Sequence, residues 1–231
     1  SVVMAGSAIR DAAGNLRQAI RAAAGRQLNC APAEVEIGIG TAKGPSGRTV
    51  YWSQLAPLSA NGEFLNNKHT YAFGAHAAHI AVDPGTGEIR LIDYVAVEDV
   101  GRIVNPATLH GQVIGSIVQG LGGTLLEHLV YDQAGQLLSA SFADYLLPAP
   151  TDFANIRGIS LENYPSPINP LGVKGAGEGG TIPVGGVIAN ALAAALASLE
   201  IEPCELPLSP PRVWKLITES VATGNRNPSH G

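Results

Sequence analysis

A single acid, Glu178, lies among five glycines between residues 172 and 181, directly before an apolar run over residues 184–199. Glycine lets the backbone approach a bulky group closely, because it carries no side chain. An acid held at such a place is suited to proton transfer. The segment therefore predicts a buried acid that acts as an active-site base.

Two other interpretations of the same segment come from its local features. An acid just before a helix also stabilises the free amides at the helix N-terminus, so a capping or turn role for Glu178 stays open. A phosphate-binding loop is disfavoured, because the Gly-Lys-Ser/Thr ending of a P-loop is missing and Glu178 would repel phosphate. Lys174, four residues earlier, is placed to offset the charge of Glu178.

The rest of the chain predicts an α+β fold, with helices packed on antiparallel or mixed sheets. Residues 71–82 and 88–97 are β-rich and flank a Pro- and Gly-rich turn, which predicts a hairpin. Pro106 opens a long helical pattern whose glycines indicate close packing, and residues 184–199 predict a helix that is apolar nearly all round and hence buried. We also expect a helix over 8–25 that Gly25 ends, a strand over 33–39, a loop over 38–47, a short helix over 51–58, a second hairpin around 132–135, a strand over 156–161 and a last helix after Pro211.

Composition narrows the classes of partner. The 231 residues are 45% hydrophobic and 14% charged with a net charge of -5, which predicts a real core and excludes a broad basic surface for nucleic acid. The sequence contains no uninterrupted apolar stretch of about 18 residues, so it predicts no membrane-spanning helix. The two cysteines, Cys30 and Cys204, form no CxxC pair, so we expect free thiols and a cytoplasmic location.

Four blocks of this sequence resemble, in the same order, the molybdenum hydroxylases of the xanthine dehydrogenase and aldehyde oxidase family. The match is nearest to the branch that includes the large subunits of aerobic carbon monoxide dehydrogenase. The blocks are Phe73-Gly74-Ala75-His76-Ala77-Ala78, Asp99-Val100-Gly101-Arg102-Ile103-Val104-Asn105-Pro106, the Gly111-Gln112 to Gly122 segment, and Gly172-Val173-Lys174-Gly175-Ala176-Gly177-Glu178-Gly179-Gly180-Thr181 with Ile188-Ala189-Asn190-Ala191.

The resemblance implies roles for individual residues. Glu178 matches the glutamate that takes a proton from a molybdenum-bound hydroxyl, so that the oxygen can attack an electron-poor carbon. Gln112 matches a glutamine that hydrogen-bonds the molybdopterin, since an amide offers both a donor and an acceptor. Ser1 matches the end of a pterin or phosphate loop. The backbone of Ala75, His76, Ala77 and Ala78 and that of Lys174, Gly175, Ala176 and Gly177 should also face the cofactor.

Histidine and acid positions elsewhere do not indicate a protein-held metal. His76 is expected either to contact the cofactor or to be a packed histidine, and His79, His110 and His128 lack ligand-like spacing. In the family, molybdenum is held through the pterin dithiolene, so no metal ligand is expected in the chain. Asp99 and Asn105 are expected to be structural, capping the turn into the helix after Pro106.

The resemblance also implies an incomplete site and several partners. The helical pattern starts almost at Ser1, which indicates a preceding piece; we expect an incomplete C-terminal molybdopterin-binding domain over residues 1–222 and a disordered tail over 223–231. Two cysteines are too few for a [2Fe-2S] cluster, which needs four. The expected partners are therefore the N-terminal part of the molybdenum subunit, a [2Fe-2S] subunit and an FAD subunit, assembled as a dimer of heteromers.

The function expected from the resemblance is oxidative hydroxylation of a small molecule: an aldehyde, an N-heterocycle or a substrate of the carbon monoxide type. The pterin form, including the cytosine dinucleotide form, is left open. One rival is a noncatalytic binding or assembly module that retains the cofactor-domain scaffold, although a scaffold requires neither Glu178 nor Gln112. Another is an enzyme without molybdenum, which would be active as this chain alone.

Overall fold

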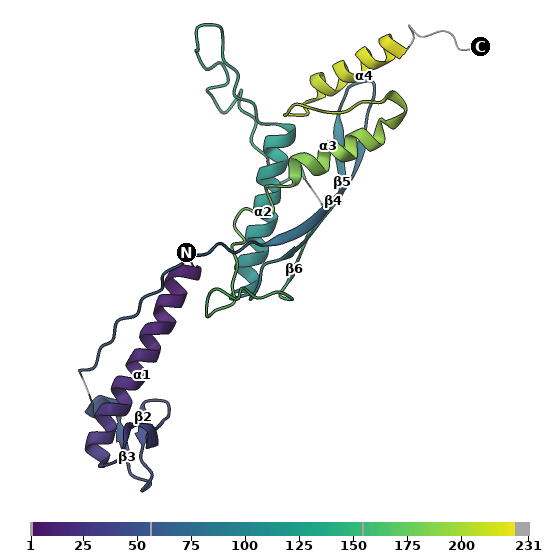
Figure 1. Ribbon diagram of the computed structural model, residues 1–231. Coiled ribbons are helices and arrows are strands. Elements are labelled where there is room, and N and C mark those ends of the chain that lie inside the picture. Colours follow the sequence, from purple (N-terminus) through teal and green to yellow (C-terminus); the bar gives the residue numbers. More distant parts are fainter. Residues whose placement is uncertain (1, 56, 154, 225–231) are drawn as a thin grey trace. The chain divides into compact units, whose positions relative to one another are not determined.

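The computed structural model describes residues 2–55, 57–153 and 155–224, and the chain divides into two compact units (Figure 1). The first unit comprises Ser1–Thr70 and Ser166–Val173, and the second comprises Tyr71–Pro165 and Lys174–Gly231. Residues 166–173 therefore pack with the first unit, although the sequence places them between two parts of the second.

The first unit consists of one long helix and a small antiparallel sheet. A π-helical turn, η1 (Val2–Gly6), leads into α1 (Ser7–Leu28), and strands β1 (Glu36–Ile37), β2 (Thr41–Lys43) and β3 (Thr49–Tyr51) pair in that order. The helix and the sheet share one core, because burying their apolar side chains against each other removes those side chains from water. Its members are Ile20, Ala23, Ala24, Leu28, Val35, Ala42, Val50 and Leu55.

Several sequence predictions for this unit were wrong in detail. Helix α1 continues past Gly25 and ends where Asn29 adopts the left-handed conformation, with φ 54° and ψ 48°. The expected strand over 33–39 contains a 3-10 turn, η2 (Pro32–Glu34), before the short β1, and the expected loop over 38–47 contains β2. Where a helix over 51–58 was expected, the described residues of that range form a 3-10 turn, η3 (Trp52–Gln54).

The second unit is built on a three-stranded mixed sheet. Strands β4 (Phe73–Val82) and β5 (Ile89–Asp99) form the predicted hairpin, with Ala75 opposite Val97. Strand β6 (Ile156–Leu161), also predicted, pairs in parallel with β5. The strand order is β4-β5-β6, so β4 pairs only with β5 within the described residues and leaves its other edge without a strand.

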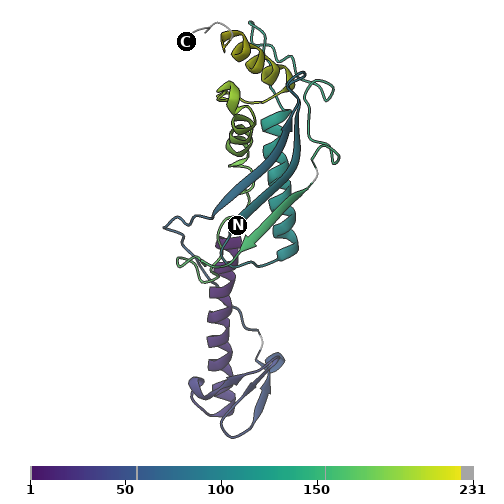
Figure 2. The same cartoon turned by 90° about the vertical axis from the view of Figure 1, so that its right-hand side faces the viewer.

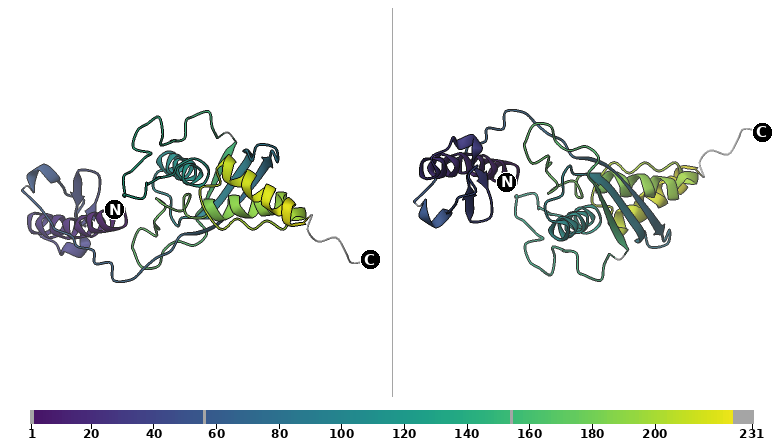
Figure 3. Two further views of the ribbon diagram at one scale, coloured as in Figure 1. Left: turned by 90° about the horizontal axis from the view of Figure 1, so that it is seen from above. Right: turned by 90° about the horizontal axis from the view of Figure 1, so that it is seen from below.

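Three helices bury one side of this sheet (Figures 2 and 3). They are α2 (Pro106–Leu125), α3 (Val184–Ala195), which the turn η4 (Ala197–Leu199) follows, and α4 (Pro210–Gly224). Asn105 caps α2, as predicted, because its side chain accepts a hydrogen bond from Thr108 N. The shared core contains Tyr94, Ala96, Val113, Ile117, Leu121, Leu125, Val184, Ile188, Leu192, Leu196, Ile201, Leu208, Val213 and Ile217.

Helix α3 is not buried on all sides, contrary to the prediction. Val184, Ile188 and Leu192 form its buried face, while positions such as Gly186 and Asn190 are exposed. The apolar composition misled the prediction, since alanine and glycine are tolerated on either side of a helix. Helix α4 extends to Gly224, one residue past the start of the expected tail, and residues 225–231 lie outside the described part of the chain.

Residues 126–153 leave the end of α2 as an irregular excursion (Figure 1). The expected second hairpin is present but short: Tyr131 and Leu137 form an antiparallel bridge, and Leu138 N donates to Val130 O at 2.7 Å. Phe142 in this excursion is 91% exposed. Among the described residues, no helix is long and apolar enough to cross a membrane, and both cysteines are free thiols.

A buried ion pair fixes the start of the glycine-rich segment beside the end of β5. The Asp99 carboxylate accepts hydrogen bonds from Lys174 Nζ at 2.9 Å, Gly101 N at 3.1 Å and Tyr164 N at 3.0 Å. The side chains of Asp99 and Lys174 are 1% and 6% exposed. Burial disfavours the charge, but the hydrogen bonds from Lys174, Gly101 and Tyr164 outweigh it and lower the pKa of Asp99. Asp99 is thus structural, as expected, but it organises the end of β5 and is not a cap of α2.

The glycines of α2 are not equivalent, and a pair of variants separates them. A Cβ added at Gly120 would lie 2.6 Å from Val184 Cγ2 and 2.8 Å from its Cβ, whereas one added at Gly115 would meet nothing within 4 Å. Gly120→Ala should lower the free energy of unfolding by about 1–3 kcal/mol through overpacking. Gly115→Ala should leave it unchanged or raise it by up to about 1 kcal/mol. Urea unfolding of both variants measures the difference, and equal effects would contradict this packing of α2 on α3.

The Asp99–Lys174 pair predicts how stability depends on pH. Because the pKa of Asp99 is lowered in the folded state, its stabilisation is present above the ordinary carboxyl pKa of about 3.9 and is lost as the pH falls through the folded-state value. Asp99→Asn should therefore lower the melting temperature at pH 7, and the difference from the parent should shrink below about pH 4. Thermal unfolding at several pH values tests this.

The matched control is Asp93→Asn, which breaks the exposed Arg157–Asp93 pair on the same sheet. Water screens that pair, so its loss should change the melting temperature much less. A melting difference for Asp99→Asn that stays constant from pH 7 to pH 3 would contradict the assignment.

Candidate cofactor-facing and catalytic site

The glycine-rich segment forms a turn that leads into α3. Lys174 N donates to Val100 O at 3.1 Å, which ties the start of the segment to the end of β5. Glu178 O then accepts hydrogen bonds from Thr181 N and Ile182 N. Helix α3 begins after Pro183 and has no side-chain cap, so the carboxylate of Glu178 does not cap it. The structure thus removes the local capping alternative, and the Glu178 carboxylate accepts no hydrogen bond from the described residues.

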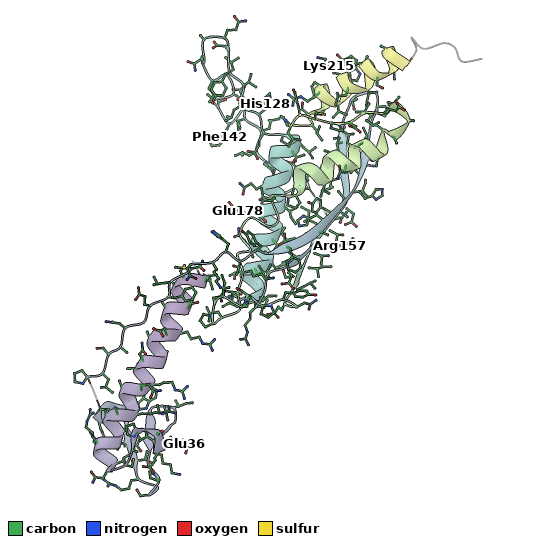
Figure 4. The ribbon with its side chains drawn as sticks, viewed as in Figure 1. Glu36, His128, Phe142, Arg157, Glu178 and Lys215 are labelled. Carbon is green, nitrogen blue, oxygen red and sulfur yellow. The ribbon has the colours of Figure 1, made fainter. Side chains whose placement is uncertain are left out.

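Glu178 is exposed within this chain, contrary to the expectation of a buried acid (Figure 4). The residues on each side explain why, since Gly177 is exposed too and a Cβ added there would meet no atom within 4 Å. Glycine neighbours bring no side chains that could cover the acid. Burial of Glu178 thus requires atoms other than those of the described residues.

Helix α2 and the acid-bearing turn are joined by a hydrogen bond. Gln112 Nε2 donates to Gly177 O at 3.1 Å, across 65 positions of sequence. Gln112 is itself exposed, and its Oε1 accepts no hydrogen bond from the described residues. The structure thereby brings together Gln112 and Glu178, two residues that the sequence analysis selected separately.

The four β4 residues expected at the cofactor differ in exposure. Ala75 and Ala77 are exposed, whereas His76 and Ala78 turn inward. They lie on the strand whose outer edge has no partner strand in the described chain, and an edge strand presents alternate free N–H and C=O groups. Backbone contacts to a ligand are therefore available here, as they are at the open Gly175 and Gly177.

The side chain of His76 is committed inside the second unit. Its Nδ1 lies 2.9 Å from the Tyr94 hydroxyl and its Nε2 lies 3.1 Å from Glu98 Oε1. The His76 and Glu98 side chains are 2% and 5% exposed. Burial, and then the nearby Glu98 carboxylate, raise the pKa of Tyr94 well above its ordinary range. His76 is thus the packed histidine of the two expected alternatives, with both ring nitrogens in hydrogen bonds inside the second unit.

Lys174 does not offset the charge of Glu178. Its ammonium pairs with Asp99 and lies 4.4 Å from the centroid of the Phe73 ring. Of the remaining expected site residues, Ala176 is half-buried in the turn, and Ser1 lies outside the described residues. In the part of the chain that the structure describes, no group of three or more His, Cys, Asp or Glu side chains is placed to hold a metal ion.

The sequence analysis missed Tyr94 and Glu98. Both belong to the inward face of β5, with Ala96 between them, because alternate residues of a strand point to the same side. The alternation over Tyr94, Ala96 and Glu98 was visible in the sequence and placed an acid on the face that carries core residues. A buried acid at such a position requires a hydrogen-bonding partner. That requirement could have predicted that the His76 side chain is buried beside Glu98.

The residues at this place fit an extended, polar cofactor that is bound mainly through backbone groups. Gln112 offers an unused amide oxygen, Gly175 and Gly177 leave open space where a Cβ would stand, and the edge of β4 offers free backbone groups. These groups line an open surface and do not enclose a ligand within the described residues.

Comparison with known proteins identifies the family of the chain. The family model described as "Molybdopterin cofactor-binding domain" matches residues 1–154, which include Gln112 and the β4 block. The chain is 34% identical over 230 residues to the 6-hydroxypseudooxynicotine dehydrogenase complex subunit gamma of Paenarthrobacter nicotinovorans, covering 93% of this chain and 29% of that protein.

Two solved structures share the fold. The Cu,Mo-CO dehydrogenase superposes with a TM-score of 0.83 at 25% identity, covering 94% of this chain and 29% of the other. Quinoline 2-oxidoreductase of Pseudomonas putida 86 superposes with a TM-score of 0.78 at 32% identity, covering 88% and 28%. The chain thus spans less than a third of the length of these proteins. The predicted α+β class is confirmed, and the chain belongs to the molybdopterin cofactor-binding domain family of the xanthine oxidase-type molybdenum hydroxylases.

Proposed function

We propose that this chain forms one wall of a molybdopterin site in a molybdenum hydroxylase and that Glu178 is the general base. The observation that carries the proposal is the hydrogen bond from Gln112 Nε2 to Gly177 O. It holds the residue before Glu178 against α2 while the carboxylate itself stays free of hydrogen bonds to the described residues. A base must be positioned and uncommitted, and Glu178 meets both conditions.

The remaining cofactor contacts follow from the same surface. Gln112 Oε1 and the second amide hydrogen of its Nε2 would hydrogen-bond the pterin, and the backbones of Ala75 to Ala78 and of Lys174 to Gly177 would line the cofactor. When bound, the cofactor supplies the oxygen that enters the product and accepts two electrons from the substrate. The part of this chain is to orient that group and to receive one proton on the Glu178 carboxylate.

The substrate and the partners are proposed from the names of related proteins. One relative is named a dehydrogenase of 6-hydroxypseudooxynicotine and one solved structure a quinoline oxidoreductase, so we propose an N-heterocycle as substrate. The complex subunit gamma and the coverage of less than a third are consistent with further chains or domains in the active enzyme. We propose that these carry the rest of the pocket and the [2Fe-2S] and FAD groups, and that the pterin is the cytosine dinucleotide form.

The role of Glu178 is tested by Glu178→Gln in the full-length, assembled enzyme. The amide keeps the size of the side chain but cannot accept the proton, so kcat should fall by about a hundredfold or more. Molybdenum and pterin content should stay near normal, because a carboxylate is not needed to hold the cofactor. Steady-state kinetics and metal analysis of the same preparation give both values.

The matched control is Glu36→Gln, which removes the same charge from an exposed position on β1 (Figure 4). That variant should retain full turnover. Unchanged turnover in Glu178→Gln would reject Glu178 as the base, and a loss of molybdenum would assign it a binding role instead.

The Gln112–Gly177 hydrogen bond is tested by Gln112→Ala. A net hydrogen bond is worth about 0.5–1.5 kcal/mol, so kcat/KM should fall by roughly two- to tenfold from misplacement of Glu178 alone, and further if the pterin contact is lost. Gln119→Ala is the control, because it removes the same type of side chain from another exposed position of the same helix. Equal kinetics for the two variants would show that Gln112 neither positions the turn nor binds the cofactor.

A further inference from the structure

A small pocket opens next to the acid-bearing turn, between the start of β4 and the start of α3. It has a volume of about 220 Å³, and its walls come from β4, β5 and the turn into α3. The lining residues are Ala72, Phe73, Gly74, His76, Glu98, Gly179, Ile182 and Pro183. All belong to the second unit, and Glu178 is not among them. The pocket is thus adjacent to the proposed base but separate from it.

Two hydrogen bonds behind the pocket link Tyr94, His76 and Glu98. The raised pKa of Tyr94 keeps its hydroxyl protonated, and this fully buried hydroxyl has only His76 Nδ1, at 2.9 Å, as its partner among the described residues. In the tautomer that uses both ring contacts, Nδ1 accepts from the Tyr94 hydroxyl and Nε2 carries the ring proton. Nε2–H then donates to Glu98 Oε1 at 3.1 Å. Glu98 is the acceptor at the end of this chain of hydrogen bonds.

The second oxygen of Glu98 is unused. Oε2 is buried and has no hydrogen-bond partner within the described part of the chain. A buried carboxylate oxygen without a donor costs free energy, so a donor supplied by a ligand would be bound favourably. Glu98 is 4% exposed, and it lines the floor of the pocket.

Two glycines clear the space around this carboxylate. A Cβ added at Gly179 would lie 2.8 Å from Glu98 Oε1 and 3.0 Å from Oε2, and one added at Gly74 would lie 3.0 Å from Glu98 Cγ. Any other residue at these positions would press on the carboxylate. The remaining walls are apolar, since they come from Ala72, Phe73, Ile182 and Pro183.

The charge balance selects the kind of donor. Lys174, whose ammonium lies over the Phe73 ring, is already paired with Asp99 and does not neutralise Glu98. The pocket floor thus presents one carboxylate oxygen without a hydrogen-bond donor among the described residues, below apolar walls. A cavity of about 150 Å³ holds benzene, so a pocket of about 220 Å³ accommodates one ring and a short substituent.

We propose that this pocket is a binding site for a small organic ammonium whose N–H donates to Glu98 Oε2 while its apolar body lies against Phe73 and Ile182. A charged donor is favoured over a neutral one, because a charge-assisted hydrogen bond in a desolvated site is about twice as strong as a neutral one. The site does not depend on Glu178 acting as a base, since Gly179, Ile182 and Pro183 of that turn line the pocket but Glu178 does not.

The test is binding of three matched one-ring probes to the full-length protein near pH 7. Benzylamine is a cation at this pH, whereas benzyl alcohol is neutral and benzoate is an anion. Calorimetric titration should show benzylamine binding at least about tenfold more tightly than the alcohol, with no binding of benzoate. Equal affinity for the three probes would overturn the proposal. So would the absence of binding, which is the outcome expected if another segment of the full-length protein fills the pocket.

Variants then assign the site. Glu98→Gln should abolish the preference for benzylamine, whereas Glu88→Gln, which removes an exposed charge from the turn of the same hairpin, should preserve it. Ile182→Trp enlarges a side chain that is 77% exposed, so it should block the pocket without disturbing the buried His76–Glu98 pair. Retained binding in both Glu98→Gln and Ile182→Trp would place the ammonium elsewhere.

The outcome is separable from that of the proposed function. Glu178→Gln should bind benzylamine like the parent protein, because Glu178 does not line the pocket. If Glu178→Gln retains turnover while Glu98→Gln loses the preference for benzylamine, Glu178 is rejected as the base and the ammonium site is retained. The reverse pattern would keep the base and reject the pocket.

Discussion

The buried pair between Asp99 and Lys174 is the constraint on which the site geometry depends. One carboxylate receives the Lys174 ammonium and the backbone N–H groups of Gly101 and Tyr164, and so holds together the end of β5, the segment after β6 and the start of the glycine-rich turn. A buried ion pair is strongly destabilising when one partner is removed, because the other charge is left without compensation. This pair therefore sets where the turn that carries Glu178 begins.

From that start, two contacts direct the rest of the turn. Gln112 binds Gly177 O from the side of α2, and the carboxylate of Glu98 lies directly below Gly179. Glu178 stands between these two contacts, with no hydrogen bond of its own to the described side chains. Its immediate neighbours are glycines, because one side of the turn packs against the Glu98 side chain and the other side is exposed. The glycines at 175 and 177 leave space, whereas Gly179 avoids a collision.

The sequence allowed the larger elements to be predicted, and the reasons are local. The β4–β5 hairpin follows from a Pro- and Gly-rich turn between two β-rich stretches, and α2 follows from Pro106 with the Asn105 cap. The small sheet of β2 and β3 could not be predicted, because strands of three residues carry too little periodicity. The end of α1 was also missed, since Asn29 rather than Gly25 takes the left-handed conformation.

For the site, the sequence by itself determined the residue types: an acid among glycines, a glutamine on a glycine-rich helix, and the order of the blocks that mark the family. The tertiary structure alone decided which side chains are free. The Lys174 side chain is paired with Asp99, and the His76 ring contacts Tyr94 and Glu98. Glu178, in contrast, is exposed. The physical reason is that buried charges and ring nitrogens must find partners, and those partners lie up to 75 positions away in the chain, where no local pattern reports them.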